Sequence, residues 1–273
     1  MRFCKYSGAG NLFTVLDGRG ESVEEMRTPS GIGLLCDEFS TEGVIIITDS
    51  ETEDFKMEFY NPDGTSGMMC GNGGRVAVSF AAALGIKPSG EDGTYSFEAP
   101  DGVHTARILS TEGPMDMVCL SMRDVTGTTY MEELEEAPVD GWKLDTGARH
   151  FVVFDEDVEE INVSGAGSVI RSCKEFAPEG TNVDFVCPYA GGIKVRTFEK
   201  GVEGETLACG TGAVAAAIAS FRQGVAPTSN EDGLITYKVK ARIASLSVSF
   251  RSDGDTFTGI TLTGPATFVM CTY

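Results

Sequence analysis

The feature of this 273-residue sequence that most constrains its fold is a motif that occurs twice. Cys70-Gly71-Asn72-Gly73 opens one apolar run, and Cys209-Gly210-Thr211-Gly212 opens another, with the cysteines 209 − 70 = 139 residues apart. The same offset, applied without gaps, superposes further identical residues: Gly8-Ala9 on Gly147-Ala148, Phe59 on Phe198, Ala77 on Ala216, Gly85 on Gly224 and Pro88 on Pro227. A period of this length indicates a duplicated domain rather than a solenoid repeat.

Each half predicts the same order of elements. A Gly-rich opening precedes an extended run, further strands follow, and one alanine-rich helix comes after the cysteine motif. The helices are expected to follow Gly73 and Gly212 and to stop at Gly85 and Gly224. Strand-like composition is found in residues 12–16, 44–48, 56–60, 151–154, 183–186, 194–198 and 245–250. The predicted class is α+β, with two homologous domains related by a pseudo-two-fold axis.

The junction between the halves is expected near Glu112-Gly113-Pro114. This places residues 1–114 in the first domain and residues 115–262 in the second. The last strand-like run, residues 267–270, lies in the segment 263–273, which is expected to return to the first domain.

Composition excludes several classes of protein. A formal net charge of −20 disfavours binding to nucleic acids and to anionic membrane surfaces. The start of the chain has no apolar signal region, and no apolar run approaches the ~18 residues that a membrane-spanning helix needs. We therefore expect a soluble cytoplasmic protein.

The cysteines and histidines predict no metal site. The eight cysteines are scattered without CxxC pairs, and the only histidines are His104 and His150. In an unexported protein all of these thiols are expected to stay reduced.

The two cysteine motifs carry the predicted chemistry. A cysteine just ahead of a helix meets the positive end of the helix dipole, which lowers the pKa of its thiol from about 8.5 toward neutrality. The glycines that follow let backbone N–H groups approach a carboxylate. Two such sites facing one another would suit inversion at carbon, where one group removes a proton and the other delivers one to the opposite face. This predicts a racemase or epimerase acting at an α-carbon without a cofactor.

Three alternatives stay open at this point. Gly8-Ala9-Gly10 suggests a dinucleotide site, although Phe13 replaces the last glycine of GxGxxG and no βαβ unit follows. A nucleophilic hydrolase would use Cys70 or Cys209 with His150, but it leaves the second cysteine unexplained. A binding protein would need the helix amides but no thiols.

The sequence around both motifs resembles the diaminopimelate epimerases almost from end to end. These are cofactor-independent enzymes that interconvert LL- and meso-2,6-diaminopimelate in lysine and peptidoglycan synthesis. The matching segments are Lys5-Tyr6-Ser7-Gly8-Ala9-Gly10-Asn11, Tyr60-Asn61-Pro62-Asp63-Gly64, Cys70-Gly71-Asn72-Gly73-Gly74-Arg75, Gly180-Thr181-Asn182-Val183, Phe198-Glu199-Lys200-Gly201 and Glu205-Thr206-Leu207-Ala208-Cys209-Gly210-Thr211-Gly212. The resemblance implies that each domain is a mixed sheet or barrel around a central helix.

The resemblance also implies roles for particular residues. Cys70 and Cys209 would be the acid/base pair. The other residues that it places in the substrate site are Asn11, Asn61, Gly71, Asn72, His150, Asn182, Glu199, Lys200, Gly210 and Thr211. Among them, the amides of the four residues after the cysteines would hold the reacting carboxylate, and His150 and Glu199 would contact the substrate's amino group or tune the thiols.

The sequence departs from the family pattern in three places, and two of them concern recognition of the substrate. Lys200 stands where the family usually has the arginine that grips the distal carboxylate, and Ala148-Arg149-His150 replaces Asn-Pro-His or Ser-Pro-His. Leu12 replaces the aspartate of Gly-Asn-Asp-Phe, which we expect to affect packing only. A cofactor-independent racemase of a different amino acid is therefore the alternative to a diaminopimelate epimerase. The expected partner is a small amino-acid substrate, and a homodimer is the candidate assembly.

Overall fold

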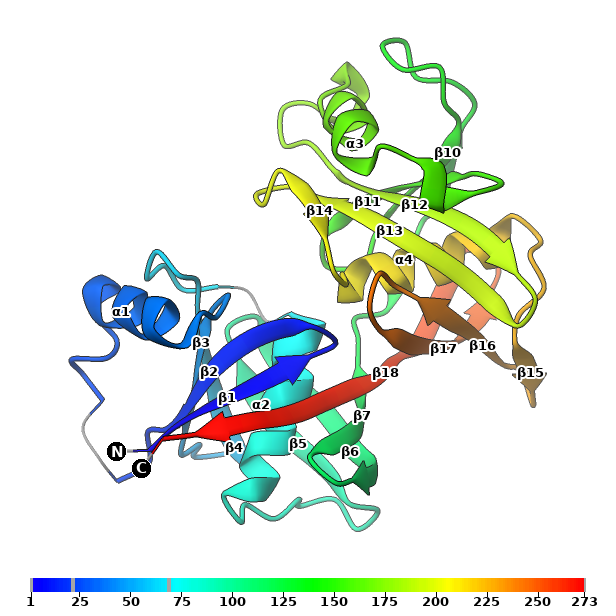
Figure 1. Cartoon of the computed structure of the whole chain (residues 1–273). Helices are drawn as coiled ribbons and strands as arrows, with labels where there is room; N and C mark the ends of the chain where they lie inside the picture. Colours follow the sequence, from blue (N-terminus) through cyan, green and yellow to red (C-terminus); the bar gives the residue numbers. More distant parts are fainter. Residues whose placement is uncertain (1, 21–22, 68–69, 273) are drawn as a thin grey trace. The chain divides into compact units, whose positions relative to one another are not determined.

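The computed structural model describes residues 2–20, 23–67 and 70–272 (Figure 1). Its backbone forms two compact units, one comprising Met1–Ser121 with Thr263–Tyr273 and the other Met122–Leu262. The division falls after Ser121 rather than near Pro114, because residues 115–121 pair with strands of the first unit.

The first unit is a barrel of eight strands that closes on itself. Its strands are β1 (Phe3–Gly8), β2 (Asn11–Asp17), β3 (Val44–Thr48), β4 (Phe55–Tyr60), β5 (Thr94–Ala99), β6 (Gly102–Glu112), β7 (Met115–Ser121) and the later part of β18 (Thr256–Cys271). Neighbours pair in chain order from β1 to β7, and β18 closes the ring by pairing with both β7 and β1. The β2–β3 and β4–β5 pairs are parallel, and the other pairs are antiparallel.

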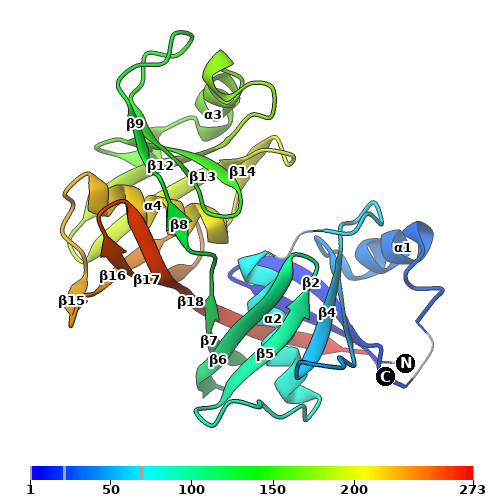
Figure 2. The same ribbon diagram turned by 180° about the vertical axis from the view of Figure 1, so that it is seen from behind.

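Helix α2 (Gly71–Ala83) fills the inside of this barrel. Every residue from Gly71 to Ala81 is buried, because most of these residues are small or apolar and the helix has strands on all sides. Figure 1 shows β1 and β2 in front of α2, and Figure 2 shows β5 and β6 covering it from behind. The helix ends before Gly85, whose φ of 80° gives the left-handed turn that glycine favours.

The second unit repeats this order. Its strands are β8 (Val125–Thr126), β9 (Thr129–Met131), β10 (Gly141–Asp145), β11 (Arg149–Phe154), β12 (Asn182–Tyr189), β13 (Gly192–Glu199), β14 (Gly204–Thr206), β15 (Ser229–Glu231), β16 (Leu234–Lys240) and β17 (Ser245–Asp253). The pairs β10–β11, β11–β12, β12–β13, β13–β16 and β16–β17 alternate antiparallel and parallel as β1 to β6 do. Helix α4 (Gly210–Arg222) contacts these strands as α2 contacts its own. The prediction of two homologous α+β halves, each built around a central helix, is confirmed.

Each unit also has an outer helix that the sequence analysis did not predict. Helix α1 (Pro29–Phe39) links β2 to β3, and α3 (Val163–Arg171) links β11 to β12. Both are capped at the N-terminus by a side chain, from Thr28 and Asn162 respectively. They bury only one face, and α1 has no alanine and α3 only Ala166, so they lack the dense alanine signal of the central helices.

Two of the cysteines correct an expectation. Cys4 on β1 lies directly opposite Cys271 on β18, and the two form a disulfide. The prediction that every thiol stays reduced is therefore wrong for this pair, because the closure of the barrel places side by side two residues from opposite ends of the sequence. The other six cysteines are not in disulfides.

Across the described residues, no helix has both the length and the apolar character needed to cross a membrane.

Candidate active site

Cys209 is the N-cap residue of the central helix in the second unit. Its sulfur accepts a hydrogen bond from the backbone N–H of Gly212 at 3.4 Å and lies 3.4 Å from the hydroxyl of Thr211. The first N–H groups of an α-helix have no partner within the helix and attract negative charge. A thiol and an anion-binding helix start therefore occur together.

A buried network supports Thr211. The His150 side chain on β11 is fully buried, and its Nδ1 lies 2.6 Å from Oδ2 of the buried Asp184 on β12. Its Nε2 lies 3.0 Å from the Thr211 hydroxyl. When the neutral ring donates Nδ1–H to the carboxylate, Nε2 is the acceptor, and the contacts run from Cys209 through Thr211 and His150 to Asp184.

Asn182, Glu199 and Lys200 extend the same network. The Asn182 amide lies 3.4 Å from His150 Nε2, and its oxygen accepts a hydrogen bond from the backbone N–H of Lys200 at 2.8 Å. Glu199 accepts a hydrogen bond from the Thr206 hydroxyl at 2.5 Å. Lys200 is an exposed residue, and its backbone N–H makes the contact with the network.

The environment of Cys209 corrects the predicted acidity. Burial, assisted by the charges of Glu199 and Asp184, raises the pKa of the Cys209 thiol well above the usual value of a cysteine. Desolvation also raises the pKa of Glu199, while hydrogen bonds from Thr206 and Cys209 oppose the rise. The expected lowering of the thiol pKa is wrong for Cys209, because the sequence argument considered neither the burial of the thiol, which is the main cause, nor the two neighbouring carboxylates.

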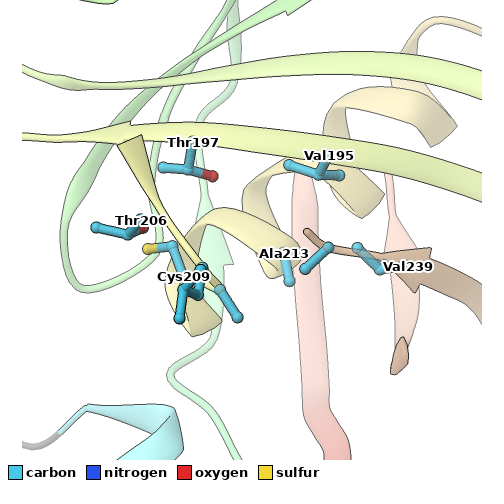
Figure 3. Close-up of a pocket in the computed structure, with 9 residues that line it drawn as sticks. Val195, Thr197, Thr206, Cys209, Ala213 and Val239 are labelled. Carbon is cyan, nitrogen blue, oxygen red and sulfur yellow. The ribbon is translucent and has the colours of Figure 1, made fainter. Parts of the chain in front are cut away.

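The backbone at Gly212 comes close to these side chains. A Cβ atom at this position would lie 2.5 Å from Oδ1 of Asp184 and 3.2 Å from the Thr197 hydroxyl, which itself donates to Asp184. Only glycine fits here. Figure 3 shows a small cavity beside Cys209, with Thr197 and Thr206 on the sulfur side and Val195, Ala213 and Val239 farther along.

Cys70 has the matching position in the first unit. It is the N-cap residue of α2, and its sulfur accepts a hydrogen bond from the Gly73 N–H at 3.2 Å. The Asn72 amide donates to the side-chain oxygen of Asn11 at 2.8 Å. The offset found in the sequence relates this pair to the other half, since 11 + 139 = 150 and 72 + 139 = 211. The Asn11–Asn72 and His150–Thr211 contacts are thus equivalent.

The remaining predicted site residues are Asn61 and the first glycine of each central helix. The Asn61 side chain donates to the Thr65 hydroxyl at 3.1 Å, within a tight turn that follows β4. Gly71 and Gly210 are the first residues of α2 and α4, and both are buried. The structure therefore gathers His150, Asn182, Glu199, Gly210 and Thr211 around Cys209, and Asn11, Gly71 and Asn72 around Cys70, while Asn61 bonds within its own turn.

Arg149 does not join the buried network. It forms an ion pair with Glu179 at 2.8 Å, and about half of each side chain is exposed, 48% and 52%. Together with Arg149, the charge of Lys200 lowers the pKa of Glu179. The two cations singled out in the sequence thus share one carboxylate as a neighbour.

Sequence reasoning missed several residues of these sites. Asp184 lies two residues after Asn182 on β12, so it shares a face of the strand with it, and that spacing was the available signal. Thr206 bonds Glu199 from β14. Arg75 was part of the quoted motif but had no assigned role.

Solved structures of other proteins have this fold. A PhzF-family phenazine biosynthesis protein from Bacillus anthracis superposes with a TM-score of 0.70 at 15% identity, covering 100% of this chain and 98% of the other. A hydroxyproline epimerase from Agrobacterium vitis superposes with a TM-score of 0.66 at 14% identity, covering 100% and 91%. The chain therefore has the duplicated fold found in these proteins.

Sequence comparison narrows this class to one family. The family model described as diaminopimelate epimerase matches residues 3–122 and 143–269. The diaminopimelate epimerase of Chlorobaculum tepidum is 39% identical over 271 residues, covering 95% of this chain and 96% of that protein. That of Aquifex aeolicus is 41% identical over 238 residues, covering 82% and 83%. The chain belongs to the diaminopimelate epimerase family.

Proposed function

We propose that this protein is an isomerase that interconverts LL- and meso-2,6-diaminopimelate, as a step of lysine biosynthesis. The single observation that carries the proposal is that each half places a cysteine outside any disulfide as the N-cap of its central helix. Membership of the family supports the choice of substrate. A cytoplasmic location and a homodimer are part of the same proposal.

In the proposed mechanism Cys70 and Cys209 act on opposite faces of one α-carbon. One thiolate takes the α-proton, and the electron pair of the broken C–H bond moves into the adjacent carboxylate. The other thiol then donates its proton to the opposite face, so that the two cysteines exchange protonation states. The amides of Gly71, Asn72, Gly210 and Thr211 stabilise the additional negative charge on the carboxylate.

The remaining polar residues position these groups. Asn11 fixes the Asn72 side chain, and His150 with Asp184 fixes that of Thr211. Asn61 and Asn182 are proposed to bind polar groups of the substrate, and Glu199 its amino group. No step requires a cofactor or a metal ion.

Hydrogen exchange tests the reaction. Incubated with LL-diaminopimelate in deuterated water, the protein should form the meso isomer and introduce one deuterium at the inverted α-carbon, as measured by mass spectrometry and NMR. Binding without exchange would contradict an epimerase. Exchange with a panel of other amino acids, but none with diaminopimelate, would favour the racemase alternative.

A second prediction concerns how the protein binds the distal carboxylate of diaminopimelate, because Lys200 stands where the family has arginine. A carboxylate leaving water needs a cation, and Arg149 offers a planar two-pronged partner that lysine cannot reproduce. We expect Arg149→Ala to raise KM for diaminopimelate at least tenfold, which corresponds to about 1.4 kcal/mol, with little change in kcat. Lys200→Arg should be tolerated or should lower KM.

Glu179→Gln is the matched control, since it removes the partner of Arg149 and leaves the cation in place. This variant should keep KM unchanged or lower it. If Arg149→Ala has no effect, and activity is higher on an amino acid with a single carboxylate, diaminopimelate is not the substrate.

A further inference from the structure

Arg75 is a buried cation that the mechanism above does not use. It lies on α2, its exposure is 0%, and it is the largest of the fully buried side chains. One guanidinium nitrogen donates to the side-chain oxygen of Asn72 at 2.6 Å, but Nε and Nη1 have no hydrogen-bond partner among the residues that the structure describes. Burial lowers the pKa of Arg75 to about 10, so it is still charged at neutral pH. A buried charge of this kind needs an anion.

The direction of the Arg75 side chain identifies which anion is near. Helical side chains point back toward the N-terminus of their helix, and the bond from Arg75 to Asn72 shows that this one does. The N-terminus of α2 is Cys70. Negative charge on Cys70 opposes the burial effect on the pKa of Arg75, so the guanidinium and the thiol interact electrostatically.

The other ionisable groups on the strands packed against α2 include no buried carboxylate that pairs with Arg75 among the described residues. Lys56 and Glu112 are exposed, and the pKa of Tyr6 is raised to about 12, which keeps it neutral. Cys119 on β7 is a half-buried free thiol. The paired groups are Asp116 with Ser79 and Thr111, Glu58 with Arg27, Glu42 with Asn11, Asp17 with Arg19, His104 with Asp101, Arg107 with Asp92, and Lys5 with the Phe39 carbonyl. Among the described residues, none of these carboxylates pairs with Arg75.

The duplication provides an internal comparison. The position equivalent to Arg75 is Val214, since 75 + 139 = 214, so the second half has no cation there. Cys209 instead has two carboxylates nearby, those of Glu199 and Asp184. Equivalent cysteines in the two halves therefore have neighbours of opposite charge.

We infer that Arg75 is a positioning residue that holds Cys70 as the thiolate, while the carboxylates around Cys209 keep that cysteine as the thiol. This deepens the proposed function and rests on it, because a two-base reaction needs one thiolate and one thiol before substrate binds. Cys70 is then the group that removes the α-proton from the first substrate to arrive. The buried cation and the helix N-terminus act on the same sulfur.

The rate of thiol alkylation tests this inference without any substrate. The wild-type protein is treated with iodoacetamide between pH 5 and pH 10, and the modification of each cysteine is followed by peptide mass spectrometry. We expect the midpoint for Cys70 to lie at least two pH units below that for Cys209. Equal midpoints, or the reverse order, would overturn the inference even if the protein epimerises diaminopimelate.

Two variants separate charge from structure. Arg75→Met removes the cation and keeps much of the volume, and it should slow alkylation of Cys70 at pH 7 at least tenfold while leaving Cys209 unchanged. Arg75→Lys keeps the charge and should restore most of the wild-type rate. If Arg75→Met loses activity but leaves the Cys70 profile unchanged, Arg75 only supports Asn72 and the inference is wrong. If neither variant folds, the wild-type comparison decides.

Discussion

Alanine at Cys70 or at Cys209 should lower kcat/KM for epimerisation at least a hundredfold, since a positioned acid or base contributes about 10²- to 10⁴-fold. Inversion needs a donor and an acceptor, so each single variant should lose it. The remaining cysteine can still remove a proton and return one to the same face. Each variant is therefore expected to exchange the α-hydrogen of one stereoisomer with deuterated water while forming almost no epimer.

Cys36→Ala is the control for loss of a thiol. Cys36 is a free, buried cysteine on α1 that packs in the cluster between that helix and β2 and β3. Its replacement should cost about 1 kcal/mol of unfolding free energy and leave kcat unchanged. Near-normal turnover by the Cys70→Ala protein would show that the base has been assigned to the wrong residue.

The second large effect is expected at Asp184. Both oxygens of this fully buried carboxylate accept hydrogen bonds, from His150 and from Thr197. Asp184→Asn presents an NH₂ group to one of these donors and removes the charge that faces the imidazole. We expect the unfolding free energy to fall by about 3 kcal/mol, as for a broken buried pair, and kcat to fall at least tenfold as Thr211 and Cys209 lose their support.

Asp145→Asn is the matched control in the same unit. Asp145 is exposed, and its carboxylate accepts a hydrogen bond from the Gly147 N–H, which an amide oxygen can also accept. Chemical denaturation should give a change of about 0.5 kcal/mol or less for this variant. Equal changes in unfolding free energy for the two substitutions would show that the burial of Asp184 and its hydrogen bonds do not contribute to stability as proposed.

The duplicated motif was sufficient to predict the core of the fold. A cysteine followed by glycines and an apolar run gave both central helices within a few residues, and Gly85 and Gly224 marked their ends because both adopt the left-handed conformation. Local signals of this kind depend on residues that are neighbours in sequence. For the same reason the strands at 44–48 and 56–60 agree closely with β3 and β4.

What could not be predicted depends on contacts between distant residues. The pKa of the Cys209 thiol is raised first by its burial and then by the charges of Glu199 and Asp184, which lie on two different strands. The dipole argument alone therefore gave the wrong direction for its acidity. The disulfide between Cys4 and Cys271 could be predicted only by knowing that the barrel closes. The burial of Arg75 could be predicted only by knowing that a helix fills that barrel.

Strand β18 has a consequence for the order in which the protein can be assembled during translation. The ribosome delivers β1 to β7 first, then the whole of Met122–Leu262, and only afterwards the residues that lie between β7 and β1. Until then the nascent first barrel has two open strand edges, which are surfaces prone to mispairing. The unit encoded second can complete most of its own strand pairing before the unit encoded first is sealed.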